Sequence, residues 1–431
     1  MPEPFEKIPE VPKHVHETLK FPDGFLWGTA LSAHQHEGNN QHSDWWAWEQ
    51  KPGNPRSGDA VNHYALYEAD FDLAKSLHQN AHRFSLEWSR LEPHEGEWDT
   101  HEVEHYQNVL RALKARGFAV ALTLHHFTNP AWFANKGGWE RRDAPRLFER
   151  YVDFAIKNFG EWVDLWLTVN EPQIYAAQSY ALGVWPPQKR SVIRAWRVLK
   201  NLARAHRAAY AAIHKAMDTD GKKAQVGFAH GLMSMVAYRK HSLLDHLALR
   251  IADKIWNHSF YDLTKGTHDF LGVNYYLHQR VKRAATKLLH NFVDPREENR
   301  EVSDMGWEIY PQGIFEALLD VKDMNLPIYI TENGISTAND DRRARFIVSY
   351  IKELYHAIHA GIDVRGYFHW SLLDNFEWDK GYTQRFGLVE VDFKTLKRMP
   401  RPSAALYAQI CKENGIPHDL LRYVGHAVEE H

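Results

Sequence analysis

Apolar runs rich in β-branched and aromatic residues recur along the whole chain and predict eight strands. They lie at Phe25–Ala33, Ala81–Trp88, Phe118–Phe127, Trp162–Asn170, Ala224–His230, Asp269–Tyr276, Pro327–Glu332 and Val364–Leu372. Runs that are apolar almost throughout are typical of parallel strands covered on both faces of their sheet.

Stretches with a helical period of apolar positions lie between these runs. The clearest are Asp99–Gly117, Pro145–Phe159, Leu199–Met217 and Arg342–Ala360. In the first, Asp99 and Glu102 have the spacing of a capping box, and Gly117 can end the helix. Gly160 can end the second helix in the same way.

Strands that alternate with helices indicate an α/β fold, and eight such units fit one closed (β/α)8 TIM barrel. No Gly/Ser-rich linker divides the chain. We therefore predict a single barrel domain over residues 21–424, an N-terminal extension at 1–20 and a C-terminal tail at 425–431. The longest irregular stretch, Arg283–Tyr310, is predicted to form a loop over the barrel mouth.

Composition narrows the class of protein. The chain has 431 residues, of which 44% are hydrophobic and 25% are charged, as in an ordinary soluble globular protein that can bury a large core. Its net charge of −3 gives no reason to expect nucleic acid or an anionic membrane as a partner. Cys411 is the only cysteine, so no disulfide can form within the chain. Without an apolar leader or a span of ~18 apolar residues, a cytoplasmic protein is expected.

Two glutamates lie at the ends of predicted strands. Glu171 stands in Thr168–Pro172, at the end of the fourth run, and Glu332 stands in Ile330–Gly334, at the end of the seventh. Catalytic residues of a TIM barrel lie at the C-terminal ends of its strands. Two such carboxylates are what cleavage of a glycosidic bond requires, although each motif alone is also an ordinary turn sequence.

Further polar and aromatic residues follow the other predicted strands. They are Gln35, His36 and Glu37 after the first, Arg83 within the second, His125 and His126 at the third, Asn274 and Tyr276 at the sixth, and Trp370, Glu377 and Trp378 after the eighth. From about residue 21 to residue 410, the chain resembles glycoside hydrolase family 1, the retaining β-glycosidases. The motifs that carry the resemblance are Phe25–Ala30, Gln35–Gly38, Thr168–Pro172, Ile330–Gly334, Asp374–Trp378, Arg385–Asp392 and Arg398–Pro402.

The resemblance implies the catalytic roles. Glu332 corresponds to the nucleophile and Glu171 to the general acid/base of a double displacement through a covalent glycosyl-enzyme. Arg83 corresponds to the cation beside the nucleophile, Tyr276 to the hydroxyl that binds it, and Asn170 to the ligand of the sugar 2-hydroxyl. A second carboxylate close to Glu171 is expected to raise its pKa by charge repulsion.

The resemblance also implies the substrate and its binding residues. These are Gln35, His126, Asn274, Trp307, Trp370, Glu377, Trp378 and Phe386, with Trp370 as a platform under the sugar ring and Trp307 on the leaving-group side. Terminal β-D-glucosides are the expected substrates, with β-galactosides and β-fucosides as further ones, free or in short oligosaccharides. No cofactor and no metal are expected, and a homo-oligomer is left open.

The chain departs from the family pattern in places. His34 and His36 stand where an aromatic and a small aliphatic residue are usual, and Phe127 stands where Trp is frequent, so the departures concern the shape and polarity of the sugar pocket and not the catalytic groups. The branch that cleaves 6-phosphoglycosides binds phosphate with Ser, Lys and Tyr, but the corresponding positions here are Glu377, Gln384 and Phe386. Repulsion between phosphate and the Glu377 carboxylate therefore favours unphosphorylated sugars. The thioglucosidase branch lacks the acid/base glutamate, whereas Glu171 is present.

Other functions remain as alternatives. A metal-dependent barrel hydrolase would use His125 and His126 together, but adjacent residues of a strand point to opposite faces. A barrel that binds glycosides without cleaving them would have lost Glu171, Glu332 or Arg83, and all three are present. A β-glycosidase with a primary preference for galactosides or mannosides also stays open.

Overall fold

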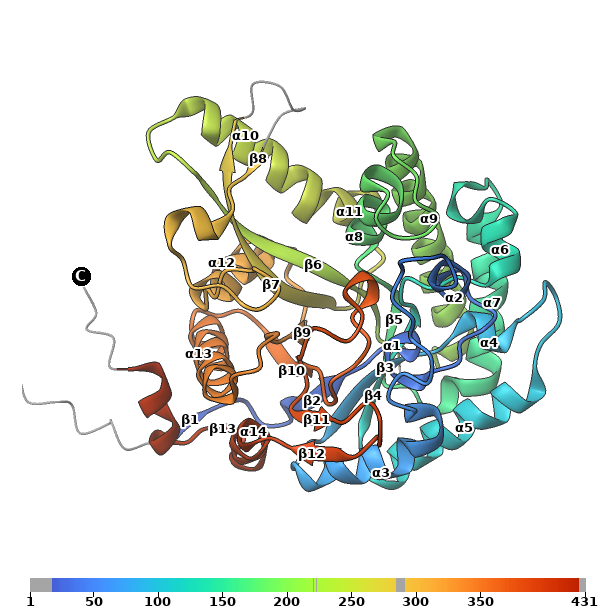
Figure 1. Ribbon diagram of the computed structural model, residues 1–431, viewed down its shortest axis with the longest axis horizontal. Coiled ribbons are helices and arrows are strands. Elements are labelled where there is room, and N and C mark those ends of the chain that lie inside the picture. Colours follow the sequence, from blue (N-terminus) through green and yellow to red (C-terminus); the bar gives the residue numbers. More distant parts are fainter. Residues whose placement is uncertain (1–17, 220, 222, 284–290, 426–431) are drawn as a thin grey trace, which may run out of the picture.

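Eight parallel strands form a closed barrel with the helices outside it (Figure 1). The computed structural model describes residues 18–219, 221, 223–283 and 291–425. The barrel strands are β2 (Leu26–Ala30), β3 (Ala81–Ser85), β4 (Ala119–His125), β5 (Leu165–Asn170), β6 (Val226–Ala237), β7 (Leu271–Lys282), β9 (Ile328–Asn333) and β10 (Val364–Trp370). Each pairs in parallel with the next, and β10 pairs with β2, which closes the ring. The predicted (β/α)8 fold is confirmed.

Two strands are longer than predicted. β6 continues to Ala237 instead of ending at His230, and β7 continues to Lys282 instead of ending at Tyr276. The extensions pair with each other from Met233 and Leu277 onward. They also pack against helix α10 (Leu243–Asp253), which buries Val281 (Figure 1). This contact is made only in the folded chain, so the local apolar run did not mark the true strand ends.

The four predicted helices are present. They are α5 (Thr100–Ala115), α7 (Ala144–Phe159), α9 (Val192–Met217) and α13 (Asp340–His359). Asp99 caps α5 by accepting from the backbone N–H groups of His101 and Glu102. The predicted capping box is only half formed, because the Glu102 carboxylate accepts from the Tyr64 hydroxyl. The third helix starts at Val192 rather than Leu199, because the Ser191 side chain caps it there.

The remaining elements complete the shell around the barrel. The other α-helices are α1 (Ala33–Glu37), α2 (Asp44–Glu49), α3 (His63–Ser76), α4 (Trp88–Leu91), α6 (Ala131–Asn135), α8 (Pro172–Ala176), α11 (Ser259–Leu263), α12 (Gln312–Val321) and α14 (Pro402–Glu413). Turns of π-helix lie at Ala177–Leu182 and Lys254–His258. Short 3-10 helices lie at Gly138–Glu140, Gly160–Trp162, Pro295–Glu298, Lys322–Met324, Trp378–Lys380 and His418–Val424.

Short strands lie outside the barrel, and one pair of them joins the two ends of the described chain. β1 (Leu19–Lys20) pairs with β13 (Gly415–Ile416), β11 (Val389–Val391) pairs with β12 (Arg398–Pro400), and β8 (Asn291–Phe292) pairs with β7. Most of the predicted N-terminal extension and C-terminal tail, at 1–17 and 426–431, lies outside the described residues. The predicted domain boundaries therefore stay a prediction. None of the helices in the described part of the chain is long and apolar enough to cross a membrane.

The core has an inner and an outer layer. Small and aromatic side chains such as Ala30, Ala81, Ala121 and Phe368 fill the barrel interior. A larger set of buried side chains, Cys411 among them, packs between the strands and the surrounding helices. The inner layer closes the barrel below its C-terminal rim. The rim itself is therefore where polar side chains can meet a ligand.

Candidate active site

A cavity of about 390 Å³ lies where the barrel strands end. Twelve of the thirteen predicted site residues line it, which are Gln35, His126, Asn170, Glu171, Asn274, Tyr276, Trp307, Glu332, Trp370, Glu377, Trp378 and Phe386. The thirteenth, Arg83, is 1% exposed and contacts Glu332 from within the barrel. The fold thus brings together residues from strand ends that are far apart in the sequence.

The carboxylate of Glu332 is held at both oxygens. Glu332 lies near the end of β9 and is 5% exposed. Arg83 Nη1 donates to its Oε1 at 2.5 Å, and the Tyr276 hydroxyl donates to its Oε2 at 3.0 Å. A guanidinium and a hydroxyl that both donate to a carboxylate favour its ionised form and fix its orientation. The arrangement suits an anion that must attack an electrophilic carbon.

Arg83 is anchored by several further acceptors. Its Nη1 also donates to the Thr331 carbonyl oxygen at 3.0 Å, its Nη2 to Asn170 Oδ1 at 2.7 Å, and its Nε to the Thr123 hydroxyl at 3.2 Å. A buried cation is costly unless it is paired and hydrogen-bonded. These contacts meet that requirement and hold the positive charge next to Glu332.

Glu171 is the first residue after β5 and adopts a left-handed backbone conformation, with φ of 41°. Its N–H donates to the Ala229 carbonyl on β6 at 2.8 Å, and its Oε1 accepts from Asn274 Nδ2 at 3.0 Å. Burial, and after it the charge of Glu332, raises the pKa of Glu171 to about 8. At neutral pH this carboxyl group is therefore mainly protonated and can act as an acid.

The amide of Asn274 is oriented by its other contacts. Its Oδ1 accepts from the Thr331 hydroxyl at 2.7 Å, so its Nδ2 must face Glu171 and Asn170. Asn170 in turn donates through Nδ2 to His126 Nε2 at 3.2 Å. Burial, and after it the charge of Arg83, lowers the pKa of His126 well below its usual value, so this ring is neutral.

A third carboxyl group, that of Glu377, also lines the cavity. Gln35 Nε2 donates to Glu377 Oε2 at 3.2 Å and to the Phe376 carbonyl at 2.9 Å, while its Oε1 accepts from Ser32. Burial, and after it the charge of Glu332, raises the pKa of Glu377 to about 8. Gln35 and Glu377 together offer hydrogen-bond donors and acceptors of the kind that sugar hydroxyls need.

Known proteins share both this sequence and this fold. The sequence model of the family described as "Glycosyl hydrolase family 1" matches residues 17–266 and 254–416. The chain belongs to glycosyl hydrolase family 1. It is therefore an O-glycosyl hydrolase of the β-glycosidase type, as predicted from its motifs.

Individual members of family 1 match over nearly their whole length. A 1,4-beta-D-glucan glucohydrolase from Thermotoga neapolitana is 32% identical over 445 residues, which cover 92% of this chain and 99% of that protein. A beta-galactosidase from Pyrococcus woesei is 30% identical and covers 92% of this chain and 98% of its own. The solved structure of a beta-glycosidase from Pyrococcus horikoshii has a TM-score of 0.88 and 38% identity, with 94% and 98% of the two chains covered.

The departures from the family 1 pattern support the aromatic wall of the cavity. The ring of His34 stacks on Trp378 at 5.6 Å and 6°, and its Nε2 lies 2.7 Å from a carboxylate oxygen of Glu49. His36 donates from Nδ1 to the Ser32 carbonyl and packs edge-on against Trp370 at 5.8 Å. The two histidines therefore pack against the tryptophans that line the cavity, His34 against Trp378 and His36 against Trp370.

His125 and His126 face different surroundings. His126 lines the cavity, whereas His125 packs against Trp139 and lies 3.1 Å from Asn129 Oδ1. Among the described residues, the one group with metal-ligand spacing includes neither histidine. The two histidines therefore do not converge on one site, in agreement with the opposite faces expected for neighbours on a strand.

Sequence reasoning missed about half of the cavity lining. The additional residues are Phe127, Ile174, Gln178, Val184, Trp185, Gly231, Leu232, Met233, Leu277, Met305, Asp379 and Lys380. Met233 and Leu277 lie on the extended parts of β6 and β7, whose ends the local apolar runs did not mark. Met305 and Trp307, from the described part of the predicted loop Arg283–Tyr310, line the cavity, whereas residues 284–290 of that loop lie outside the described residues.

Two glycines allow the backbone to approach the catalytic groups. A Cβ atom at Gly231 would lie 3.1 Å from Glu171 Oε1, and one at Gly334 would lie 1.9 Å from the Trp370 carbonyl oxygen. The second distance is far too short for any side chain. Gly334 is therefore required for β9 and β10 to place Glu332 and Trp370 at one cavity.

Proposed function

We propose that this enzyme hydrolyses terminal β-D-glucosides with retention of configuration, through a covalent glycosyl intermediate on Glu332. The observation that carries the proposal is the contrast between its two carboxyl groups. Both oxygens of Glu332 accept hydrogen bonds, from Arg83 and Tyr276, whereas Glu171 has a pKa raised to about 8. A nucleophile and an acid are the two groups that the first step needs.

In the first step, a Glu332 oxygen attacks the anomeric carbon and forms an ester bond. The bond between that carbon and the leaving-group oxygen breaks, and Glu171 gives its proton to this oxygen. Arg83 and Tyr276 orient the carboxylate for the attack through their hydrogen bonds to its two oxygens. Asn170 is positioned beside Glu171 to bond the 2-hydroxyl next to the reacting carbon.

In the second step, Glu171 changes its role. Esterified Glu332 carries no charge, so the repulsion that raised the pKa of Glu171 disappears and this pKa falls. Ionised Glu171 then takes a proton from water, and the water oxygen attacks the anomeric carbon. The ester bond breaks and Glu332 leaves as the carboxylate. Two inversions restore the original configuration.

The sugar is proposed to lie between Trp370 and the polar residues around it. Gln35, His126, Glu377 and Trp378 would bond its hydroxyls, and Asn274 would hold Glu171 in place. Because a carboxyl group can bond a 4-hydroxyl in either epimer, glucosides, galactosides and fucosides are all proposed substrates. The names of the relatives, a glucan glucohydrolase and a beta-galactosidase, support the first two.

The leaving group must lie next to Glu171, which protonates it. Apolar side chains line the cavity in this region, among them Ile174 on α8 and the paired residues Met233 and Leu277 of β6 and β7. Trp307 packs beside Tyr276 and Phe386. This lining supports leaving groups with an apolar face, such as an aryl group or a second sugar ring.

Phosphorylated sugars are proposed to be poor substrates, but for a different reason than the sequence indicated. The pKa of Glu377 is raised to about 8, so repulsion by this group is weak at neutral pH. Lys380 also lines the cavity, yet its ammonium group is paired with Asp379 at 2.7 Å. Gln384 is not among the described residues that line the cavity, and its Oε1 accepts a hydrogen bond from the Ser336 hydroxyl. The described cavity therefore offers no unpaired cation to a phosphate.

A panel of p-nitrophenyl β-glycosides tests the proposed substrate. We expect kcat/KM to be highest for the glucoside, followed by the galactoside and fucoside, and lower for the mannoside. The Glu332→Ala variant serves as the blank for each substrate. A folded protein without activity on any of the four substrates would contradict the proposal. If kcat/KM were highest for the mannoside, the preferred substrate would be a β-mannoside and not a β-glucoside.

The pKa of Glu171 predicts an alkaline limb in the pH profile. Raising the pH through about 8 deprotonates the acid, so kcat/KM for an alkyl β-glucoside should fall about tenfold per pH unit above that value. Glu377 titrates in the same range, so the two groups must be separated. We expect Glu171→Gln to remove the limb and Glu377→Gln to keep it. The reverse result would assign the limb to sugar binding.

The hydroxyl of Tyr276 predicts a measurable catalytic contribution. Tyr276→Phe removes the hydrogen bond to Glu332 Oε2, and a bond to a charged group is worth about 1.5–3 kcal/mol. We therefore expect kcat/KM to fall about 10- to 150-fold. Tyr275→Phe is the matched control, because that hydroxyl contacts the Tyr310 carbonyl at 3.3 Å instead. Equal activities of the two variants would refute this role of Tyr276.

A further inference from the structure

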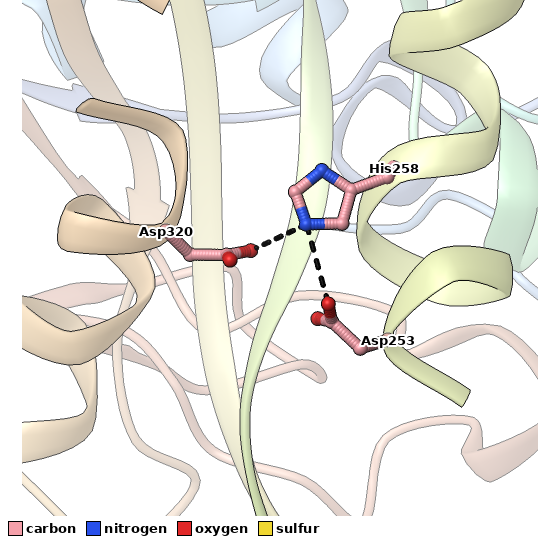
Figure 2. Close-up of side chains that lie close together, drawn as sticks. All are labelled: Asp253, His258 and Asp320. Carbon is pink, nitrogen blue, oxygen red and sulfur yellow. Dashed lines mark ion pairs between the residues drawn. The ribbon is translucent and has the colours of Figure 1, made fainter. Parts of the chain in front are cut away.

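Three potential metal ligands converge on the outside of the barrel, away from the cavity. Asp253 ends α10, His258 ends the π-helical turn that follows it, and Asp320 lies in the last turn of α12. Figure 2 shows both carboxylates pointing at the imidazole ring. One ligand atom from each residue lies within 4.8 Å of the others. The three side chains therefore surround one point in space.

The π-helical turn is what brings two of these residues together. Asp253 and His258 are five positions apart, so an α-helix with about 3.6 residues per turn would place them on different faces. The widened turn at Lys254–His258 lets both side chains face α12 instead (Figure 2). Turns of this kind are rare and are found frequently at functional sites.

Both carboxylates contact the same ring nitrogen. His258 Nε2 lies 2.9 Å from Asp320 Oδ2 and 3.3 Å from Asp253 Oδ2. A single N–H cannot point along both directions, so the contact to Asp253 Oδ2 is the weaker one, while Asp253 Oδ1 accepts from Asn257 Nδ2 at 2.8 Å. In a tetrahedral zinc site with bonds of about 2.0–2.2 Å, ligand atoms lie about 3.3–3.6 Å apart. Small side-chain movements would therefore convert this arrangement into a three-ligand metal site.

The surrounding charges also favour a cation at this point. Asp320 stands in the last turn of α12, where the helix dipole disfavours a negative charge, and the described residues of that turn include no basic one. The nearest lysine on the turn, Lys254, is paired with Asp262 at 2.5 Å. The side chains of Asp253, His258 and Asp320 are 32%, 28% and 34% exposed, so an ion and its water ligands have access.

We propose that Asp253, His258 and Asp320 form a binding site for one divalent zinc ion, completed by water. One imidazole nitrogen and two carboxylate oxygens are a donor set that suits zinc. The ion would link the α10–α11 segment, which covers the extended ends of β6 and β7, to α12. Its role is structural, because none of the three residues is among the described residues that line the catalytic cavity.

Zinc must displace a proton to bind. Zinc takes the place of the proton at His258 Nε2, where both carboxylates make contact, because metal ligands bind in their deprotonated form. Binding of zinc at pH 7 should therefore release protons. The affinity for zinc should also increase as the pH rises from 6.5 to 7.5. An ion held only by exposed carboxylates would release no such proton, which gives the site a measurable signature.

Isothermal titration of the metal-free protein with zinc chloride tests the proposal. We expect one ion per chain with a Kd of about 10 µM or below, and a proton release revealed by buffers of different ionisation enthalpy. His258→Ala and Asp320→Asn should weaken binding at least about tenfold, a loss of one ligand. His246→Ala, an exposed histidine on α10, and Asp262→Asn are matched controls that should bind as the wild type does.

Two outcomes would overturn the proposal. Equal zinc binding by all variants would show that the ion binds at another histidine. Absence of binding up to about 1 mM zinc would show that the three residues form only an ion pair, in which His258 bridges the two carboxylates. A rise in Tm with zinc that the His258→Ala variant lacks would support it. Glycosidase activity of each variant should equal that of the wild type, which shows that the chain is folded.

Discussion

Replacement of Glu332 by alanine is expected to reduce kcat/KM for every β-glycoside by about 10⁵-fold or more. The covalent intermediate needs an oxygen anion at this position, and alanine supplies none. The loss should be the same for good and poor leaving groups, because the bond to the sugar cannot form in either case. Steady-state rates with dinitrophenyl and alkyl β-glucosides measure this.

The variant must be shown to be folded, because removal of Glu332 leaves Arg83 without its charged partner. Loss of one partner of a buried ion pair typically costs about 3–5 kcal/mol of stability. Glu332→Gln is the matched control, since its amide oxygen still accepts from Arg83 but attacks poorly. Added azide should restore activity to Glu332→Ala with an α-glycosyl azide as product. Near wild-type turnover without azide would disprove the nucleophile assignment.

Replacement of Glu171 by alanine is expected to affect substrates unequally. Alkyl and disaccharide leaving groups need a proton as they depart, so their kcat/KM should fall by about 10²–10⁴-fold. A dinitrophenolate leaves without help, so kcat/KM for that glucoside should change little. Equal losses on both kinds of substrate would argue against an acid role for Glu171.

The second step should be slowed for every substrate in the same variant. Without Glu171 no base activates the water, so the glycosyl-enzyme accumulates and a burst of dinitrophenol precedes the steady state. Azide needs no base, so it should raise kcat and yield a β-glycosyl azide. The opposite configurations of the azide products from the two variants separate the two roles. If Glu332→Ala gave the β-glycosyl azide, the roles of nucleophile and acid/base would have to be exchanged between Glu332 and Glu171.

The sequence by itself predicted the barrel and about half of the residues that line the cavity. Apolar runs of strand length marked all eight barrel strands, and barrel geometry brings the C-terminal end of every parallel strand to one rim. Glu171 and Glu332 could therefore be placed together although they lie far apart in the chain. Family motifs identified Arg83, which local pattern alone shows only as a charged residue in an apolar run.

The supporting contacts could not be predicted in this way. The extension of β6 and β7 depends on their pairing with each other and on the helix that covers them, and it determines that Met233 and Leu277 reach the cavity. His34 departed from the family pattern, yet its stacking on Trp378 is defined only once α1 and the 3-10 helix Trp378–Lys380 meet. Such contacts join distant segments and leave no periodic signal.

The chemistry of the two glutamates was likewise divided between sequence and tertiary structure. The sequence determined that both side chains stand at strand ends. The family motifs also predicted Arg83 and Tyr276 beside Glu332, but only the tertiary structure decided which atoms meet. Arg83 and Tyr276 donate to the two oxygens of Glu332, whereas Glu171 accepts from Asn274. A pKa depends on burial and on neighbouring charges in space. Two residues of the same type therefore acquire different roles only when the barrel has closed.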